Sequence, residues 1–142
     1  MTDKVFFDSN VLLYLLSDDV RKAACAEALL AGGGVISVQV LNEVVSVCLR
    51  KFGMTWAQVD VLLAPVRALC RVEPLTEATH DLGRQLAQRY GLSVYDAMIV
   101  ASALEAEALT LYSEDMHDGL RVEGGLQIQN PFRARSVQEP GV

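Results

Sequence analysis

Carboxylates recur along the 142-residue chain at places where an apolar run ends or a helical pattern begins. These acids are Asp8, Glu43, Asp96 and the group Glu114, Asp115 and Asp118. Ionised carboxylates that lie close together repel one another, so a cluster of them requires a cation. A site with carboxylate ligands and no His or Cys ligand would hold a hard divalent ion such as Mg²⁺ or Mn²⁺. His117 lies between the loop acids and could neighbour such a site, but a His in this position is more often a surface turn residue.

Each acid also has an ordinary structural explanation. Asp8 could accept hydrogen bonds from amides of the turn that follows it. Asp96 stands three residues after Ser93 and could complete a capping box, while Glu43 could favour the positive end of a helix. The acids beside Gly119 suit a turn. Taken one at a time, these explanations compete with a metal site, so the elements that carry the acids must decide whether the acids meet.

Strand-like and helical patterns alternate along the chain. Strands are predicted at 4–7, 35–38, 70–75, 109–113 and 126–129. Helical patterns cover 11–16, 20–31, 41–52, 56–69, 77–90 and 94–108, and Pro65 should kink or divide the fourth. Strands separated by helices pair in parallel through right-handed crossovers, which predicts a three-layer α/β domain. The carboxyl ends of such strands share one edge, and the acids are predicted to meet there.

Composition predicts one globular domain over residues 1–133 and a flexible C-terminal tail over 134–142. The net charge of -6 argues against a broadly basic nucleic-acid-binding face, although a local basic rim stays possible. Cys25, Cys48 and Cys70 are far apart and form no CxxC, so we expect reduced thiols. No signal sequence or membrane-spanning run is visible, and we therefore expect a cytoplasmic protein that does not associate with a membrane.

Four stretches of the chain resemble the acidic motifs of PIN-domain ribonucleases, particularly the VapC-like toxins of bacterial toxin–antitoxin pairs. They are "FFDSNVLLYLL", "SVQVLNEVVSV", "LSVYDAMIVASALEAEA" and "LTLYSEDMHDG", in this order. The resemblance extends from about residue 4 to residue 132. It implies a three-layer α/β/α domain with a parallel sheet of about five strands. It also implies an endoribonuclease that depends on Mg²⁺ or Mn²⁺, acts on an RNA substrate, forms a homodimer and is inhibited by an antitoxin protein.

The same resemblance assigns catalytic and metal-binding roles to particular acids. The catalytic set is Asp8, Glu43, Asp96 and Asp115. Asp8, Asp96 and Asp115 are the expected metal ligands, and Glu43 either joins them or accepts a proton from the attacking water. The fourth acid is ambiguous, because Asp118 is an alternative to Asp115, whereas strand alternation should turn Glu114 away. Asn10 and Ser113 could orient the ligands or bound water.

Three other kinds of protein compete with the nuclease hypothesis. A phospho-acceptor α/β domain would carry an acidic pair near the first strand and a late Lys, but no Lys follows Lys51. A dehalogenase-like phosphatase would carry a second Asp two residues after Asp8, where this chain has Asn10. A non-catalytic PIN-like binding module would keep the fold and lose little when the acids are changed.

Overall fold

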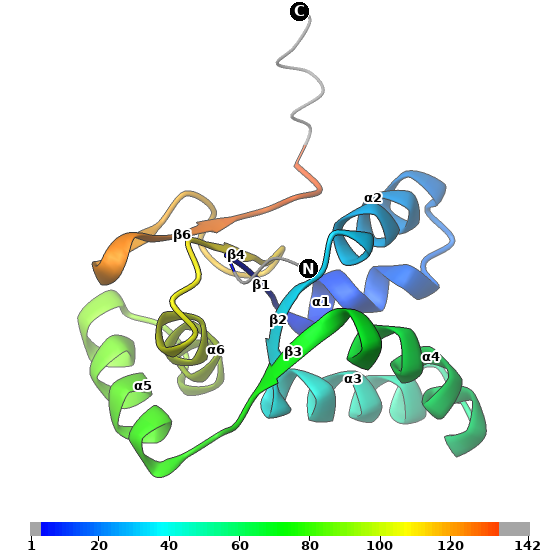
Figure 1. The fold of residues 1–142 in the computed structure, drawn as a ribbon, viewed down its shortest axis with the longest axis horizontal. Helices are drawn as coiled ribbons and strands as arrows, with labels where there is room; N and C mark the ends of the chain where they lie inside the picture. The colour runs from blue at the N-terminus through cyan, green and yellow to red at the C-terminus, as the bar shows by residue number, and fades with distance from the viewer. Residues whose placement is uncertain (1–3, 134–142) are drawn as a thin grey trace, which may run out of the picture.

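Short strands alternate with helices in the computed structural model, which describes residues 4–133 (Figure 1). The strands are β1 (Val5–Phe7), β2 (Gly34–Ser37), β3 (Cys70–Glu73), β4 (Thr110–Tyr112), β5 (Arg121–Val122) and β6 (Leu126–Gln129). The helices are α1 (Ser9–Leu13), α2 (Val20–Ala31), α3 (Val38–Arg50), α4 (Trp56–Leu69), α5 (Glu77–Tyr90) and α6 (Val94–Glu105). Two 3-10 turns, η1 (Tyr14–Leu16) and η2 (Glu123–Gly125), complete the order. The tail expected at 134–142 lies outside the described residues.

The strands form one six-stranded sheet in the order β3-β2-β1-β4-β6-β5. Five of them are parallel, and β5 alone pairs in the antiparallel direction, with β6. The predicted parallel sheet of about five strands is therefore confirmed. The sixth strand was not predicted because its two residues are too short to show an alternating pattern.

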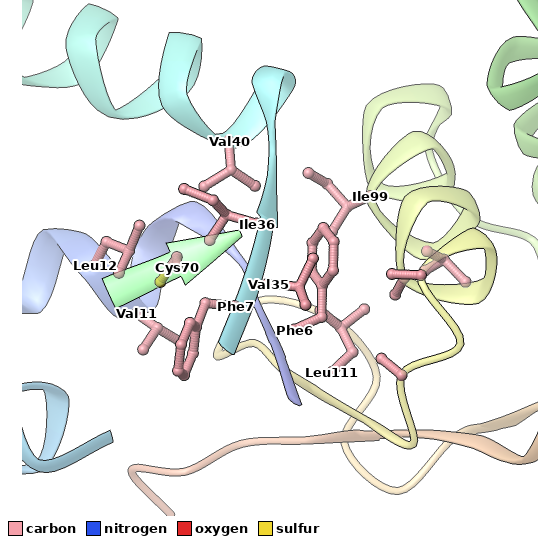
Figure 2. Packing of buried hydrophobic residues seen from close by; sticks show 14 of the residues in the cluster. Phe6, Phe7, Val11, Leu12, Val35, Ile36, Val40, Cys70, Ile99 and Leu111 are labelled. Atoms are coloured by element: carbon pink, nitrogen blue, oxygen red, sulfur yellow. The ribbon is translucent and has the colours of Figure 1, made fainter. Parts of the chain in front are cut away.

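Helices cover both faces of this sheet, as the three-layer prediction required. Figure 1 shows α5 and α6 on one face and α1 to α4 on the other. The division follows from alternation along β1, where the consecutive buried residues Phe6 and Phe7 point to opposite faces. In Figure 2, Phe6 lies toward Ile99 of α6, while Phe7 lies on the side of Val11 and Leu12 of α1. Both faces are apolar, which explains why the central strands read as continuous hydrophobic runs.

Side-chain caps fix where the helices that carry the acids begin. The Ser37 hydroxyl accepts a hydrogen bond from the Val40 amide, so α3 starts at Val38, three residues before the predicted position. Ser93 caps α6 in the same way. Caps of this kind determine which residue opens the helix and therefore which face of the helix carries each later acid.

Pro65 was predicted to kink or divide helix α4, and the structure shows no division. The helix runs without interruption from Trp56 to Leu69. A proline inside a helix removes the hydrogen bond to the carbonyl four residues earlier, here that of Val61. Both Pro65 and Val61 are exposed, so water can satisfy this carbonyl.

Two smaller expectations can be compared with the structure. Cys48 and Cys70 are buried, Cys25 is half-buried, and none of the three forms a disulfide within the described residues. Over residues 4–133, no helix combines the length and the apolar composition that crossing a bilayer requires.

Candidate active site

Asp8 lies at the carboxyl end of β1, where it also caps the first turn of α1. The side chain is 4% exposed and accepts hydrogen bonds from the Ser9 amide (2.7 Å), the Ser113 hydroxyl (2.8 Å) and the Asn10 amide group (3.2 Å). Burial, together with smaller contributions from the charges of Glu43 and Asp96, raises the pKa of Asp8 to about 6 despite the Ser113 and Ser9 hydrogen bonds. The capping explanation is therefore correct but incomplete, because capping does not balance the charge.

Glu43 reaches Asp8 through Ser9. The Ser9 hydroxyl donates to Glu43 Oε1 at 2.8 Å, while the Ser9 backbone amide donates to Asp8. The Gln39 side chain, one turn earlier on α3, donates to Glu43 Oε2 at 3.3 Å and to the Tyr95 carbonyl at 2.9 Å. The second turn of α3 thus presents Glu43 to the end of β1, and Gln39 ties it to the start of α6.

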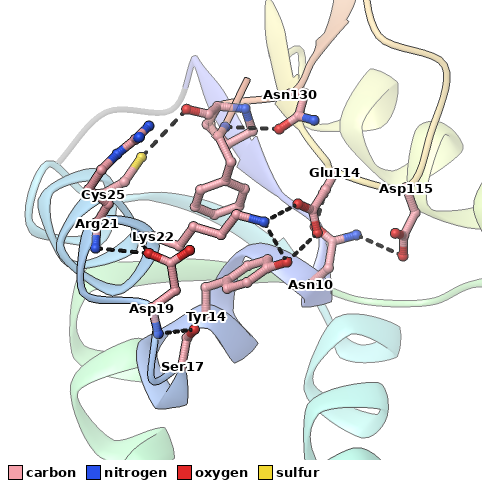
Figure 3. A network of polar contacts seen from close by, with 12 residues as sticks. Asn10, Tyr14, Ser17, Asp19, Arg21, Lys22, Cys25, Glu114, Asp115 and Asn130 are labelled. Carbon is pink, nitrogen blue, oxygen red and sulfur yellow. Dashed lines mark hydrogen bonds and ion pairs between the residues drawn. The ribbon is translucent and has the colours of Figure 1, made fainter. Parts of the chain in front are cut away.

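Asp115 reaches Asp8 through Asn10. The Asn10 Nδ2 group donates to Asp8 Oδ2 and to Asp115 Oδ2, at 3.2 Å each, and Figure 3 shows it directed at Asp115. The Asn10 carbonyl oxygen accepts the backbone amide of Glu114 at 3.0 Å. Asn10 therefore fixes two carboxylates and the loop that carries one of them.

Ser113 lies at the end of β4 and is fully buried. Its hydroxyl donates to Asp8 Oδ2 and accepts the Met116 amide at 3.2 Å. The residue therefore fixes Asp8 and the loop after β4 at the same time. Asn10 and Ser113 both lie where the sequence predicted groups that orient ligands.

Asp96 enters from the first turn of α6 and is half-buried. Its backbone amide donates to the Ser93 hydroxyl at 3.2 Å, which is the cap that starts the helix. Burial raises the pKa of Asp96 above its ordinary value although a Ser93 hydrogen bond lowers it, and the charge of Asp115 adds to the increase. Asp96 is thus within electrostatic reach of Asp8 and of Asp115.

Glu114 and Asp118, the other two loop acids, have cationic partners of their own. Glu114 accepts a hydrogen bond from the Tyr14 hydroxyl at 2.6 Å and pairs with Lys22 at 3.0 Å (Figure 3). Asp118 accepts the Asn130 amide at 2.7 Å and pairs with Arg133 at 3.2 Å. We call these two residues the paired acids, and we call Asp8, Glu43, Asp96 and Asp115 the site acids.

The two sets differ in charge compensation. Among residues 4–133 the structure records no ion pair between a site acid and a Lys, Arg or His side chain. The pKa of Glu114 shows the opposite effect. Burial raises it, but the hydrogen bonds from Tyr14 and Lys22 and the charge of Lys22 outweigh burial and lower it below its ordinary value. The site acids therefore carry negative charge that no described side chain neutralises, and a bound cation would neutralise it.

The oxygen atoms that the side chains of this site offer to a cation are those of carboxylates and hydroxyls, which suit Mg²⁺ or Mn²⁺. Within the described part of the chain, no three or more His, Cys, Asp or Glu side chains already surround a single metal position. Magnesium usually keeps several waters and needs only one or two carboxylates together with substrate phosphates. The residues therefore fit a shared metal–substrate site rather than a closed protein cage.

Sequence reasoning did not identify Ser9, Gln39, Tyr14 and Lys22. The sequence could have pointed to Ser9 as a site residue, because Ser9 stands between Asp8 and Asn10 in the first acidic motif. Gln39 stands four residues before Glu43, which places both on one helix face once α3 is known to start at Val38. Tyr14 and Lys22 carry no such signal, because their contact with Glu114 joins segments that are far apart in the sequence.

Comparison with solved structures gives the same fold in several proteins. VapC20 from Mycobacterium tuberculosis, described as a sarcin-ricin loop cleaving toxin, is 21% identical with a TM-score of 0.63, covering 78% of this chain and 89% of that one. A toxin–antitoxin complex from Klebsiella pneumoniae is 22% identical with a TM-score of 0.66, covering 90% and 98%. VapBC2 from Rickettsia felis, bound to a DNA fragment from its promoter, is 18% identical with a TM-score of 0.63, covering 89% and 97%.

Sequence comparisons extend this result. No curated protein sequence matches the chain. The family model of the PIN domain matches residues 5–117, a segment that contains all four site acids and every strand from β1 to β4. This segment makes up most of the 142 residues. The chain therefore belongs to the PIN domain family.

Proposed function

We propose that this PIN-domain protein is a divalent-metal-dependent endoribonuclease and the toxin of a toxin–antitoxin pair. One observation carries the proposal. Four separate segments bring the site acids to one edge of the sheet, where the described residues provide no cationic side chain to pair with them. Holding several ionised carboxylates this close together destabilises the folded protein unless a cation neutralises their charge. A polyanionic substrate can approach such a site only after neutralisation.

In the proposed mechanism, Asp8, Asp96 and Asp115 hold Mg²⁺ or Mn²⁺ beside the scissile phosphodiester. A bound divalent ion supplies an activated water and offsets the charge that develops on the phosphoryl oxygens. Asn10 keeps Asp8 and Asp115 at a fixed spacing, and Ser113 holds the second oxygen of Asp8. Two roles suit Glu43, which is held at the rim by Ser9 and Gln39: an additional ligand, or the acceptor of the proton from the attacking water.

The biological part of the proposal is supported by the proteins that share the fold. The Mycobacterium tuberculosis protein is a toxin that cleaves the sarcin-ricin loop, and the Klebsiella pneumoniae structure is a toxin–antitoxin complex. We extend these properties to this chain as an RNA substrate and an antitoxin partner. The homodimer that the PIN-family resemblance implies and the cytoplasmic location expected from the sequence complete the proposal. Single-stranded or loop RNA is the expected substrate class, because the edges of bases in an RNA duplex are difficult to reach.

Cleavage of a mixed cellular RNA pool by the purified protein tests the enzymatic part. Reactions with Mg²⁺, with Mn²⁺ and with EDTA are compared for wild type, Asp96→Asn and Asp60→Asn. Asp60 is the matched control because it is an exposed acid on α4. Discrete fragments are expected from wild type and Asp60→Asn with metal, and not from Asp96→Asn or in EDTA. Cleavage that persists in Asp96→Asn would overturn the proposal, as would its absence in wild type.

The toxin assignment has its own test. Induced expression of wild type in a bacterial host should stop growth, whereas induced expression of Asp96→Asn at the same level should not. Growth arrest by both proteins would favour a non-catalytic module that acts by binding. Normal growth with a protein that cleaves RNA in vitro would leave the nuclease in place and remove the toxin assignment.

A further inference from the structure

A cavity of about 370 Å³ opens directly beside the site acids. The residues of its wall that matter here are Asn10, Leu13, Asp18, Lys51, Phe52 and Glu114. Asn10 belongs to both places, since its side chain contacts Asp8 and Asp115 and also lines the cavity. A substrate whose phosphate lies at the site acids would therefore place its neighbouring group at the mouth of this cavity.

Part of the cavity wall is apolar. Leu13 and Leu16 provide apolar wall, and Phe52, just past the end of α3, is 47% exposed. An aromatic ring that is half-exposed on the wall of a cavity can accept another planar ring by stacking. Unpaired nucleobases bind to proteins in this way, and stacking tolerates every base because each one has a π face.

The charges around the cavity suit a nucleotide. Glu114 would repel a phosphate if it were free, but Lys22 and Tyr14 already engage it. Lys51, also on the wall, is exposed and provides a cation for the RNA backbone. Among residues 4–133 the structure records no partner for the Asp18 carboxylate, so this side chain can accept hydrogen bonds from a ligand.

We propose that this cavity binds the unpaired base next to the scissile phosphate, an inference that rests on the proposed ribonuclease function. The base stacks on Phe52, Lys51 contacts the backbone, and the Asp18 carboxylate accepts hydrogen bonds from N–H groups on the edge of the base. Guanine is the preferred base, because its ring N–H and adjacent amino group offer two neighbouring donors to one carboxylate. Asp18 is thus the residue that determines the choice of base, and Phe52 contributes affinity for any base; both lie outside the catalytic acids.

Substitution of Phe52 tests the stacking step. Phe52→Ala should raise the KM for a short single-stranded RNA between about 5-fold and 100-fold with a smaller change in kcat, and Phe52→Tyr should restore most of the loss. Trp56→Ala is the matched control, since Trp56 is an exposed aromatic residue nearby in sequence that does not line the cavity. Equal kcat/KM for Phe52→Ala and wild type would overturn the proposal while leaving the ribonuclease function intact.

Substitution of Asp18 tests the choice of base. Sequencing of the fragment ends from a random single-stranded RNA pool should show guanine enriched next to the cut by wild type. Asp18→Asn should reduce that enrichment while still cleaving the pool, and Asp19→Asn serves as the neighbouring control. Asp19 caps α2 through hydrogen bonds to Arg21 and Lys22 amides and does not line the cavity. No preference in wild type, or one that Asp18→Asn leaves unchanged, would reject the role of Asp18.

A binding measurement separates failure of this inference from failure of the proposed function. Fluorescence anisotropy of a labelled single-stranded RNA with Ca²⁺ in place of Mg²⁺ requires no cleavage. Wild type should bind the single strand more tightly than the corresponding duplex, and Phe52→Ala should weaken single-strand binding by a similar factor to the increase in KM. Binding that is equal in wild type and Phe52→Ala overturns the base cavity whether or not the wild type cuts RNA.

Discussion

The site acids and the paired acids lie next to each other, yet their charges are balanced in different ways. Glu114 and Asp115 are neighbours in the sequence, but Glu114 turns to Lys22 and Tyr14 while Asp115 turns to Asn10 (Figure 3). Within residues 4–133, the protein supplies a cation for the first carboxylate and only neutral hydrogen-bond donors for the second. Neutral donors orient a carboxylate but leave its charge in place, and this is the arrangement that a metal ligand needs.

This contrast also bears on the ambiguity between Asp115 and Asp118. Asp118 is engaged by Arg133 and by the Asn130 amide, and both contacts tie the loop after β4 to the end of β6. Asp115 is linked through Asn10 to Asp8. We therefore propose Asp115 as the fourth member of the catalytic set and a structural role for Asp118.

The largest expected effect on the rate of RNA cleavage comes from replacing Asp115 and Asp118 by Asn in two separate variants. Asp115→Asn should lower the rate of RNA cleavage between about 100-fold and 1000-fold, because it removes a charge that positions the metal at the transition state. Asp118→Asn keeps an oxygen that can accept the Asn130 amide and should change the rate by less than about 3-fold. Initial rates with Mn²⁺ measure both effects, and circular dichroism checks that both variants fold. A larger loss in Asp118→Asn than in Asp115→Asn would reverse the assignment.

The next effect is the pH dependence of stability without metal. The folded pKa of Asp8 is about 6 and its ordinary value is 3.8, so between these pH values the folded state keeps a proton that the unfolded state has released. The stability contributed by Asp8 is fully present well below pH 3.8 and is lost as the pH rises through 6, by about 3 kcal/mol in total. Relative to Asp8→Asn, wild type should become less stable by most of this amount between pH 4 and pH 7. Urea unfolding in EDTA measures it, and a pH-independent difference would contradict the burial argument.

A smaller effect is expected from adding the metal. Mn²⁺ at ten times its Kd should stabilise wild type by about 1.4 kcal/mol, which raises the Tm by roughly 4 °C. Asp8→Asn should show little shift, whereas Glu114→Gln should respond like wild type because Glu114 already has its cation. Thermal unfolding at pH 7.5 with and without Mn²⁺ gives the comparison. The same shift in all three proteins would place the ion outside the site acids.

The smallest effect concerns the paired acids themselves. Lys22→Met should lower the Tm by less than the shift that Mn²⁺ produces, because Lys22 and Glu114 are partly exposed and solvent screens their interaction. The double variant Lys22→Met/Glu114→Gln should recover part of the loss, since it removes the unpaired charge as well. Thermal unfolding at low and high salt measures both variants. A double variant less stable than the single one would show that Glu114 has a role beyond pairing with Lys22.

The sequence by itself determined the fold class and the candidate acids. Alternating strand and helix patterns are local properties, so they predicted the parallel sheet and its three layers, and the sheet predicted a common edge for the acids. The two-residue strand β5 and the uninterrupted α4 were not predicted, because pairing with β6 and solvent access to the Val61 carbonyl are properties of the folded chain.

Only the tertiary structure decided how each acid is compensated. The partners of Glu114 lie 92 and 100 residues away, and the Asn10 contact with Asp115 spans 105 residues. Local patterns carry no information about which distant side chain will face a given carboxylate, because that depends on how the helices pack on the sheet. The electrostatic difference between neighbouring residues 114 and 115, and the cavity that joins α1 to the end of α3 beside them, exist only once those distant segments meet.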